Sequence, residues 1–347
     1  MNQINLNSRE YDVIIVGAGF SGLYQLICLR DQLGMNCLVV ETGDDVGGTW
    51  YWNRYPGARC DTESHAYSYY FSDELLKEWT WSERYPGHAE IRRYMNFVAY
   101  KFDLKKDILF NHKVTSAQYN EDKVCWKITT NNKINFRSKF LITAVGCLSN
   151  ANIPKIKGLE NFKGKYYHTG NWPKNDVSFV GKKVGQIGTG STGIQAVPVI
   201  AEEAKHLTVF QRTANYSVPA RNKPLTENFK IHVKERFKYY RKLLKKTPNG
   251  HPFEISDRLV ADVQEQEMQE IYEKAWEKGG LQFRGSFSDL VTNVEANKTA
   301  SDFIKNKINE TVSNKKFAAI LSDIDHPYAG KRPPIDTNYF ETYNRDN

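Results

Sequence analysis

The apolar positions of residues 11–42, YDVIIVGAGFSGLYQLICLRDQLGMNCLVVET, fall into three runs separated by glycines. A β-branched run covers residues 13–16, a stretch of helical length follows the glycines, and a second short run covers residues 37–40. Short β-branched runs are typical of buried strands, and longer apolar stretches of helices. The pattern predicts a strand, a glycine turn, a helix and a second strand ending at Glu41.

The same pattern returns at residues 183–193, KVGQIGTGSTG, where a strand again leads into a glycine turn. We expect a helix at residues 194–204 and then a strand at residues 207–210, followed by Gln-Arg-Thr with Arg212 in the middle. Residues 140–146, FLITAVG, predict a further buried strand. The alternation favours an α/β fold with two Rossmann-like dinucleotide-binding domains.

Residues 223–325 are charged, rich in Glu and Lys, and helical in period, as at residues 262–278. We interpret them as a helical insertion in the second domain. On this interpretation residues 1–148 form the first domain, whereas residues 152–222 and 326–347 together form the second.

A basic segment inside the insertion, residues 230–246 (KIHVKERFKYYRKLLKK), has eight basic side chains and one acidic one. Val233, Phe237, Tyr240 and Leu244 recur in it at helical spacing, which predicts one amphipathic helix with a solvated basic face. Nearly all of the chain's net charge of +8 therefore belongs to this segment. We expect neither a nucleic-acid nor a membrane partner, and contact with one of them remains the alternative.

The composition is that of a multidomain globular protein, with 347 residues of which 40% are hydrophobic. No apolar run approaches the roughly 18 residues that a membrane span needs, and residues 1–10 do not resemble a signal peptide. The five cysteines are odd in number and widely spaced, so they predict neither disulfides nor a metal site. We expect a soluble cytoplasmic protein with reduced thiols.

The first glycine turn has the spacing of a dinucleotide-binding fingerprint. Gly17 permits the tight turn, Gly19 lets the backbone approach a pyrophosphate, and Gly22 lets the helix pack closely on the strand. Glu41 follows at the distance where an acid accepts the ribose hydroxyls. Because a carboxylate repels a 2′-phosphate, FAD is favoured here. GGTWYWNRYPGARCD, which begins at Gly47, resembles flavoproteins that hold FAD; a merely packed loop is the alternative.

The second glycine turn repeats the fingerprint, but the strand after its helix is followed by a basic residue, Arg212, instead of an acidic one. A guanidinium at Arg212 can make a bidentate contact with a 2′-phosphate, which selects NADPH over NADH; a surface arginine is the alternative. One FAD unit and one NADPH unit imply hydride transfer from nicotinamide to flavin. A disulfide reductase would need a closely spaced cysteine pair, whereas Cys28 and Cys37 lie nine residues apart. The electrons of the reduced flavin would therefore pass to oxygen or to another acceptor.

Three motifs resemble the Baeyer-Villiger flavin monooxygenases, such as cyclohexanone and phenylacetone monooxygenase. FKGKYYHTGNWP fits the pattern FxGxxxHxxxWP of this family. Flavin N-oxygenases have a related stretch but usually lack the Trp-Pro ending. The run from Gly48 to Asp61 and the C-terminal KRPPIDTNYFETYNRDN resemble the same family. They follow one another in the family's order. The first pattern is carried by Phe162, Gly164, His168, Trp172 and Pro173.

The resemblance implies an oxygen insertion. Reduced FAD captures O2, the flavin peroxide attacks a ketone carbonyl, and the adduct rearranges to an ester or lactone. Arg332 matches the family's active-site arginine and Asp61 the carboxylate that pairs with it, a fixed cation being suited to the developing negative charge. Lys331 matches a second contact to the NADP 2′-phosphate. We expect His168 to be a hinge or packing residue and not an acid/base catalyst.

The resemblance also implies the cofactor contacts. Those to FAD are expected at Gly17, Gly19, Ser21, Gly22, Glu41, Thr49, Trp50, Tyr51, Trp52, Arg59, Cys60, Asp61, Tyr67 and Val114. Those to NADPH are expected at Gly188, Thr189, Gly190, Ser191, Thr192, Gly193, Ile194, Arg212, Thr213, Lys331 and Arg332.

The sequence departs from the family at its end, because the family continues after NRDN with a segment that completes the FAD domain. We therefore expect an incomplete FAD domain that a complementing C-terminal polypeptide could finish. Two other functions stay open: an N- or S-oxygenating flavin monooxygenase, and a truncated non-catalytic fragment or subunit of a split enzyme.

Overall fold

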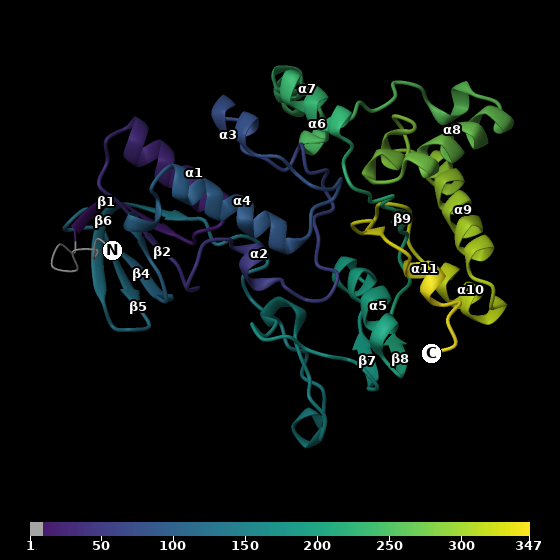
Figure 1. The fold of residues 1–347 in the computed structure, drawn as a ribbon, viewed down its shortest axis with the longest axis horizontal. Coiled ribbons are helices and arrows are strands. Elements are labelled where there is room, and N and C mark those ends of the chain that lie inside the picture. The colour runs from purple at the N-terminus through teal and green to yellow at the C-terminus, as the bar shows by residue number, and fades with distance from the viewer. Residues whose placement is uncertain (1–9) are drawn as a thin grey trace. The chain divides into compact units, whose positions relative to one another are not determined.

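The computed structural model describes residues 10–347, so the N-terminal tail and the expectation that it is no signal peptide lie outside the described part. The chain divides into two compact units (Figure 1). The first consists of Met1–Tyr55 and His88–Lys174, and the second of Pro56–Gly87 and Asn175–Asn347. Residues 56–87, which follow the first glycine motif in sequence, thus belong to the second unit.

A six-stranded sheet with strand order β3-β2-β1-β6-β5-β4 forms the centre of the first unit. β1 pairs in parallel with β2 and β6, and β2 with β3, while β4 and β6 both pair antiparallel with β5. The predicted strands at residues 13–16 and 37–40 are confirmed, whereas the one predicted at residues 140–146 begins at Asn135 and already ends at Thr143. The strands are β1 (Glu10–Val16), β2 (Cys37–Val40), β3 (Ile108–Leu109), β4 (Val114–Asn120), β5 (Cys125–Thr130) and β6 (Asn135–Thr143).

Helices of the first unit lie along this sheet. α4 runs beside α1 in Figure 1, and the rings of Phe20 and Tyr94 lie 6.1 Å apart. Ile14, Leu38 and Phe136 of the sheet are fully buried, and β-branched and aromatic residues such as Ile14 and Phe136 pack well on a pleated surface. The helices and turns are α1 (Phe20–Leu26), which continues as the π-helical η1 (Ile27–Gln32), α2 (Thr49–Trp52), α4 (His88–Lys101), and the 3₁₀ turns η2 (Lys105–Asp107), η3 (Leu159–Asn161) and η4 (Thr169–Asn171).

The second unit contains two small parallel sheets. β7 (Lys183–Ile187) pairs with β8 (His206–Phe210), and α5 (Ser191–Glu203) connects them, as the second fingerprint predicts. β9 (Val218–Pro219) pairs with β10 (Ile335–Asp336). The C-terminal part of the chain therefore returns to the strand that follows β8 in sequence.

Seven further α-helices of the described residues belong to the second unit, five of them within residues 223–325, as expected for the insertion. Its core is aromatic: the Tyr272 and Phe283 rings stack with centroids 5.3 Å apart, and Phe303 lies 5.7 Å from Phe283. The helices are α3 (Asp73–Glu78), α6 (Glu227–Glu235), α7 (Phe237–Lys246), α8 (Glu265–Lys278), α9 (Val294–Thr311), α10 (Lys315–Ser322) and α11 (Tyr339–Thr342), with 3₁₀ turns η5 (Pro248–Gly250), η6 (Val260–Asp262) and η7 (Leu281–Gly285).

The prediction of one continuous basic helix at residues 230–246 is wrong. Arg236, with φ −109° and ψ 17°, ends α6 and separates it from α7. Phe237, Tyr240 and Leu243 are the buried residues of α7, whereas α6 has no buried residue. The two halves pack differently, which an uninterrupted helical period does not reveal. Among the described residues, no helix is both long and apolar enough to cross a bilayer.

Candidate functional site

The first glycine turn has the geometry that its spacing predicts. Gly17 has φ +104°, and its N–H donates to the Val40 carbonyl at 2.9 Å. A Cβ on Gly22 would lie 1.8 Å from the Gly17 carbonyl oxygen, so only glycine lets α1 approach the strand this closely. A Cβ on Gly19 would meet nothing nearer than Gly48 at 3.5 Å, and this position is open enough for a ligand to approach the backbone.

Glu41 lies at the end of β2 and is 5% exposed. Its two carboxylate oxygens accept hydrogen bonds from the N–H groups of Ala18 and Gly43, each at 2.7 Å. These bonds place the carboxylate beside the glycine turn, and each oxygen keeps a second lone pair for another donor such as a ribose hydroxyl. The chain before Val114 is close as well, since the His112 N–H donates to the Glu41 carbonyl.

The tryptophan-rich motif forms α2, which begins directly after Gly48. Gly48 is a contact of the fingerprint, because a Cβ on it would lie 2.8 Å from the Gly19 Cα. Trp50 and Tyr51 are buried, and the Tyr51 hydroxyl donates to Asp44 at 2.7 Å. Thus the first unit brings together the predicted contacts Gly17, Gly19, Ser21, Gly22, Glu41, Thr49, Trp50, Tyr51, Trp52 and Val114.

The remaining predicted FAD contacts, Arg59, Cys60, Asp61 and Tyr67, belong to the second unit. The Gln195 side chain of α5 holds this segment, because its amide donates to the Arg59 carbonyl at 3.1 Å and its oxygen accepts from the Arg59 N–H at 3.4 Å. Cys60 is buried, and burial raises the pKa of its thiol, which disfavours the reactive thiolate.

The second glycine turn repeats the first. Gly188 has φ +102°, and a Cβ on Gly193 would lie 2.2 Å from the Gly188 carbonyl oxygen. Gly190 has no neighbour within 4 Å of its Cβ position. Thr189 donates to the Thr213 carbonyl at 3.4 Å, which joins the turn to the chain after β8. Ser191, Thr192 and Ile194 follow in the first turn of α5.

Three residues predicted to contact the 2′-phosphate lie in this unit. Arg212 is exposed directly after β8, with Thr213 beside it, and Lys331 is exposed before β10. Asn215 connects the chain after β8 to the chain before β10, because its side-chain amide donates to the Arg332 carbonyl at 3.3 Å.

Arg332 and Asp61 form an ion pair in the second unit. A terminal nitrogen of the Arg332 guanidinium donates to the Asp61 carboxylate at 2.5 Å, across 271 residues of sequence. The Asp61 side chain is 16% exposed and that of Arg332 is 73% exposed. The arginine is therefore held at one end by a largely buried carboxylate while most of its donors remain open.

His168 occupies a local structural position. Its Nδ1 accepts a hydrogen bond from the Gly170 N–H at 3.1 Å and caps the short turn η4. The Tyr167 and Trp172 rings lie 5.4 Å apart, so the aromatic motif packs on itself. These contacts are those of a packing residue; the hinge role remains a prediction.

Sequence reasoning did not single out Gln195 or the ion pair between Glu63 and Arg84, at 2.6 Å. Both fasten residues 56–87 to the rest of their unit, since Arg84 also donates to the Lys278 carbonyl. Neither has a sequence signal, because isolated Gln, Glu and Arg residues are common on surfaces.

Comparison with known proteins places this two-fingerprint α/β fold in a class. Residues 10–281 match the family model for flavin-binding monooxygenase-like proteins. The chain belongs to this family, and both the predicted fold class and the resemblance to Baeyer-Villiger monooxygenases are confirmed.

Individual relatives differ in their chemistry. The chain is 46% identical to a cyclohexanone 1,2-monooxygenase from Acinetobacter sp, covering 97% of this chain and 62% of that protein. It is 40% identical to a phenazine N-monooxygenase from Lysobacter antibioticus, covering 99% and 63%. A solved structure of OTEMO in complex with FAD and NADP superposes with a TM-score of 0.94 at 42% identity, covering 98% of this chain and 65% of that one. The chain thus spans less than two thirds of the length of these proteins.

Proposed function

We propose that this chain supplies both nucleotide sites of an FAD- and NADPH-dependent monooxygenase that inserts one oxygen atom of O2 beside a ketone carbonyl. The product would be an ester or lactone. The observation that carries the proposal is the Arg332–Asp61 ion pair, which joins the two motifs expected to form the active site. The match to ketone-oxygenating relatives supports it.

The residues at both glycine turns fit a dinucleotide. Gly19 and Gly190 leave open backbone at the start of a helix, where amide N–H groups favour phosphate. Glu41 would hold the FAD ribose, while Arg212, Thr213 and Lys331 would hold the NADPH 2′-phosphate. Bound FAD, reduced by NADPH, supplies the chemistry that activates O2.

Arg332 would stabilise negative charge as it develops on oxygen. Its guanidinium is a planar cation with several donors, and the Asp61 carboxylate restrains its direction. Because Asp61 occupies one terminal nitrogen, the other donors remain for the reacting oxygen.

Four glycine variants test the cofactor sites. Gly190→Ala should abolish NADP⁺ binding with little loss of stability, because a Cβ there meets no protein atom. Gly19→Ala should do the same for FAD, since its nearest contact is an ordinary one. Gly193→Ala and Gly22→Ala are the matched controls that should destabilise by about 1–3 kcal/mol or more through backbone clashes. Unchanged cofactor affinity in Gly19→Ala and Gly190→Ala would refute these sites.

The activity test is incubation with NADPH, O2 and a panel of cyclic and aromatic ketones, with ester or lactone as the product. Consumption of NADPH that yields only hydrogen peroxide across the panel would count against ketone oxygenation. An N- or S-oxygenating function is the second candidate, favoured by the identity to a phenazine N-monooxygenase. A parallel panel of amines, N-heterocycles and sulfides separates the two.

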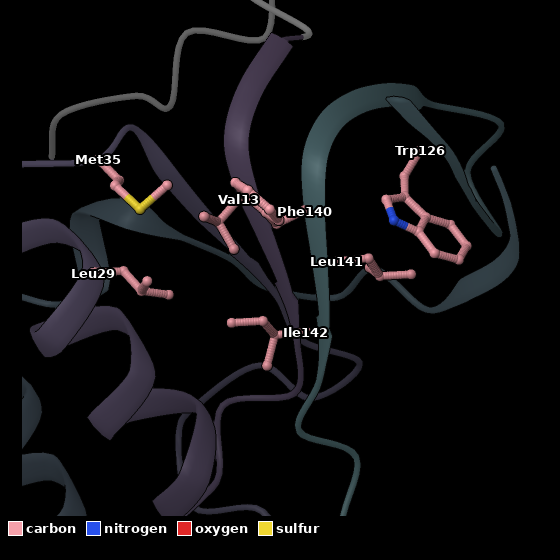
Figure 2. A pocket seen from close by; sticks show the side chains of 7 residues that line it. All are labelled: Val13, Leu29, Met35, Trp126, Phe140, Leu141 and Ile142. Atoms are coloured by element: carbon pink, nitrogen blue, oxygen red, sulfur yellow. The ribbon is translucent and has the colours of Figure 1, made fainter. Parts of the chain in front are cut away.

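We further propose that an additional polypeptide segment completes the first unit. An apolar hollow of about 490 Å³ opens there between β1, η1, the chain before β2, β5 and β6. It is lined by Val13, Leu29, Met35, Trp126, Phe140, Leu141 and Ile142 (Figure 2). Phe140 is 57% exposed, and nearby in sequence Val145 and Leu148 are 50% and 61% exposed. Apolar surface of this kind is typical of an interaction site.

The edge of β6 supports the same proposal. Its first part, up to Ser138, pairs with β5, whereas within residues 10–347 the part from Phe140 to Thr143 pairs with β1 alone. A free strand edge beside apolar side chains can accept another strand. The alternative, a non-catalytic fragment or split-enzyme subunit, is decided by the same experiment.

The experiment co-expresses this chain with the C-terminal third of the Acinetobacter cyclohexanone monooxygenase. A copurifying complex with more bound FAD and less binding of a hydrophobic dye is the expected result. Phe140→Asp should prevent it while leaving NADP⁺ affinity, a property of the second unit, unchanged. If the chain alone binds FAD stoichiometrically and is active, no such segment is needed.

Location in the cytoplasm remains part of the proposal, consistent with all five cysteines being free thiols.

A further inference from the structure

The segment that carries Lys331 and Arg332 is fastened by its next few residues. The Val218 N–H donates to the Pro334 carbonyl at 3.2 Å, and the Ala220 N–H donates to the Asp336 carbonyl at 2.7 Å. These are the hydrogen bonds of the short β9–β10 pair. With only two residues in each strand, this pair needs further contacts to hold the segment.

Those contacts come from Asp336 and Ser217, both buried: Asp336 is 5% exposed and Ser217 is fully inaccessible. One Asp336 carboxyl oxygen lies 2.6 Å from the Ser217 hydroxyl oxygen, and the other lies 3.3 Å from the Tyr339 N–H. The Ser217 hydroxyl also lies 3.3 Å from the Pro334 carbonyl. The three groups bridge β9, β10 and α11.

The hydrogens in this cluster depend on the state of the carboxyl. A serine hydroxyl has one hydrogen, and an ionised carboxylate only accepts. With Asp336 ionised, Ser217 therefore has one hydrogen for two acceptors, so one of the two contacts of its hydroxyl is no longer a hydrogen bond, while the Pro334 carbonyl keeps its bond from the Val218 N–H. With Asp336 protonated, the carboxyl donates to Ser217 and Ser217 donates to Pro334, so both contacts of the Ser217 hydroxyl are hydrogen bonds.

The surroundings favour the protonated form. The pKa of Asp336 is raised to about 6, chiefly by burial and in addition by the Glu341 carboxylate. The hydrogen bonds from Ser217 and the Tyr339 N–H and the charge of Arg221 act in the opposite direction without cancelling the effect of burial.

We propose that Asp336, through its protonated carboxyl, is a positioning residue that locks the Lys331–Arg332 segment onto β9. Its ionisation removes one of the two hydrogen bonds of the Ser217 hydroxyl and leaves a charge in a buried site, which loosens the segment. The lock itself depends only on the second unit. Its consequence for NADP⁺ rests on the proposed function, in which Lys331 contacts the 2′-phosphate.

The sign follows from linkage. The pKa in the locked state is above the ordinary value of 3.8, so the lock is strongest below that value and weakens as the pH rises through about 6. Hydrogen-exchange protection of the Val218 and Ala220 amides, corrected for intrinsic exchange, should fall about tenfold between about pH 5 and about pH 7.5. Asp336→Asn should remove this dependence, because its amide donates to Ser217 as the protonated acid does.

Ser217→Ala is the second variant. It removes the bridge in both states, so protection should be reduced at every pH. Wild-type protection that is constant over this range and equal to that of Asp336→Asn would overturn the proposal, as would full protection in Ser217→Ala.

NADP⁺ affinity tests the consequence for the segment. The ratio of affinities between Asp336→Asn and wild type should be near one at about pH 5 and severalfold in favour of the variant at about pH 7.5. The ratio is used because the 2′-phosphate itself titrates near pH 6. If protection changes but the ratio stays flat, Asp336 does not position the binding segment. If no variant binds NADP⁺, the proposed function fails while hydrogen exchange still decides whether the lock exists.

Discussion

Glu41 illustrates how one side chain can serve both fold and ligand. Its carboxylate accepts hydrogen bonds from the Ala18 and Gly43 N–H groups and so fixes the shape of the glycine turn. The same carboxylate is the group predicted to hold the FAD ribose. A substitution at this residue would therefore change stability and flavin binding together.

Glu41→Gln should lose most of its FAD, and its free energy of unfolding should fall by about 1–3 kcal/mol. The reason is that the glutamine NH2 group would face either the Ala18 or the Gly43 N–H, a donor against a donor. Thermal unfolding and the flavin-to-protein ratio measure the two effects. Asp45→Asn, on the same loop but with contacts to Arg92 and Lys105 instead, is the control. Wild-type FAD content in Glu41→Gln would contradict the ribose assignment.

Arg332 presents the opposite case, in which function should outweigh stability. Its side chain is 73% exposed, and exposed ion pairs contribute only about 0–1 kcal/mol. Arg332→Lys should therefore unfold within about 1 kcal/mol of wild type yet lose about a hundredfold or more in oxygenation rate, because the planar fork is gone. Rates of NADPH-dependent product formation test this, with Arg345→Lys as a control near the C-terminus. An active Arg332→Lys would require another charge-stabilising group.

At the scale of elements, the basic segment, residues 230–246, is held in place by contacts of its two helices, α6 and α7, with residues 56–87. α6 and α7 meet at His65: its ring lies 5.5 Å from Phe229 and 4.9 Å from Tyr240. Arg241 of α7 also donates to Asp73 at the start of α3. The two helices are thus held by residues 56–87, the same segment that carries Asp61.

This packing should be sensitive to acid. Burial lowers the pKa of His65 and Arg84 lowers it further, while Glu63, 3.6 Å away, opposes them. Because the folded pKa is below the ordinary 6.5, stability is present above that value and is lost as the pH falls below it. His65→Phe should flatten the acid side of the stability curve, measured by denaturant unfolding between about pH 5 and about pH 7.5. An unchanged slope would mean that other groups set the acid sensitivity.

At the scale of the whole molecule, each unit has its own core and its own glycine turn. The charge is also uneven, since the basic α6–α7 segment carries nearly all of the excess. Such an arrangement allows a ligand of one unit to stabilise that unit by itself.

Calorimetry should resolve this as two transitions. NADP⁺ at about a hundred times its Kd should stabilise the transition of the second unit by about 2.7 kcal/mol, and Gly190→Ala should abolish this shift alone. Gly19→Ala, which alters only the first unit, should leave the NADP⁺ shift intact. A single transition that shifts as a whole would show that the units unfold together.

Much of the site could be predicted because its signals are local. Both glycine turns, the acid after β2 and the arginine after β8 lie within about 30 residues of their fingerprints, the length of one strand-helix-strand unit. The break at Arg236 could not be predicted, because the apolar period runs through it and only the different packing of α6 and α7 reveals it. Gln195 and Asp336 are single polar residues whose importance comes from burial and distant partners.

The sequence by itself determined where the glycine turns lie, since a Cβ at Gly22 or Gly193 collides with its own turn whatever surrounds it. Only the tertiary structure decided how distant residues combine. Asp61 meets Arg332 across 271 residues, and Asp336 meets Ser217 across 119. The physical reason is that steric limits of a turn act between neighbours in the chain, whereas ion pairs and buried protons depend on what folding brings together.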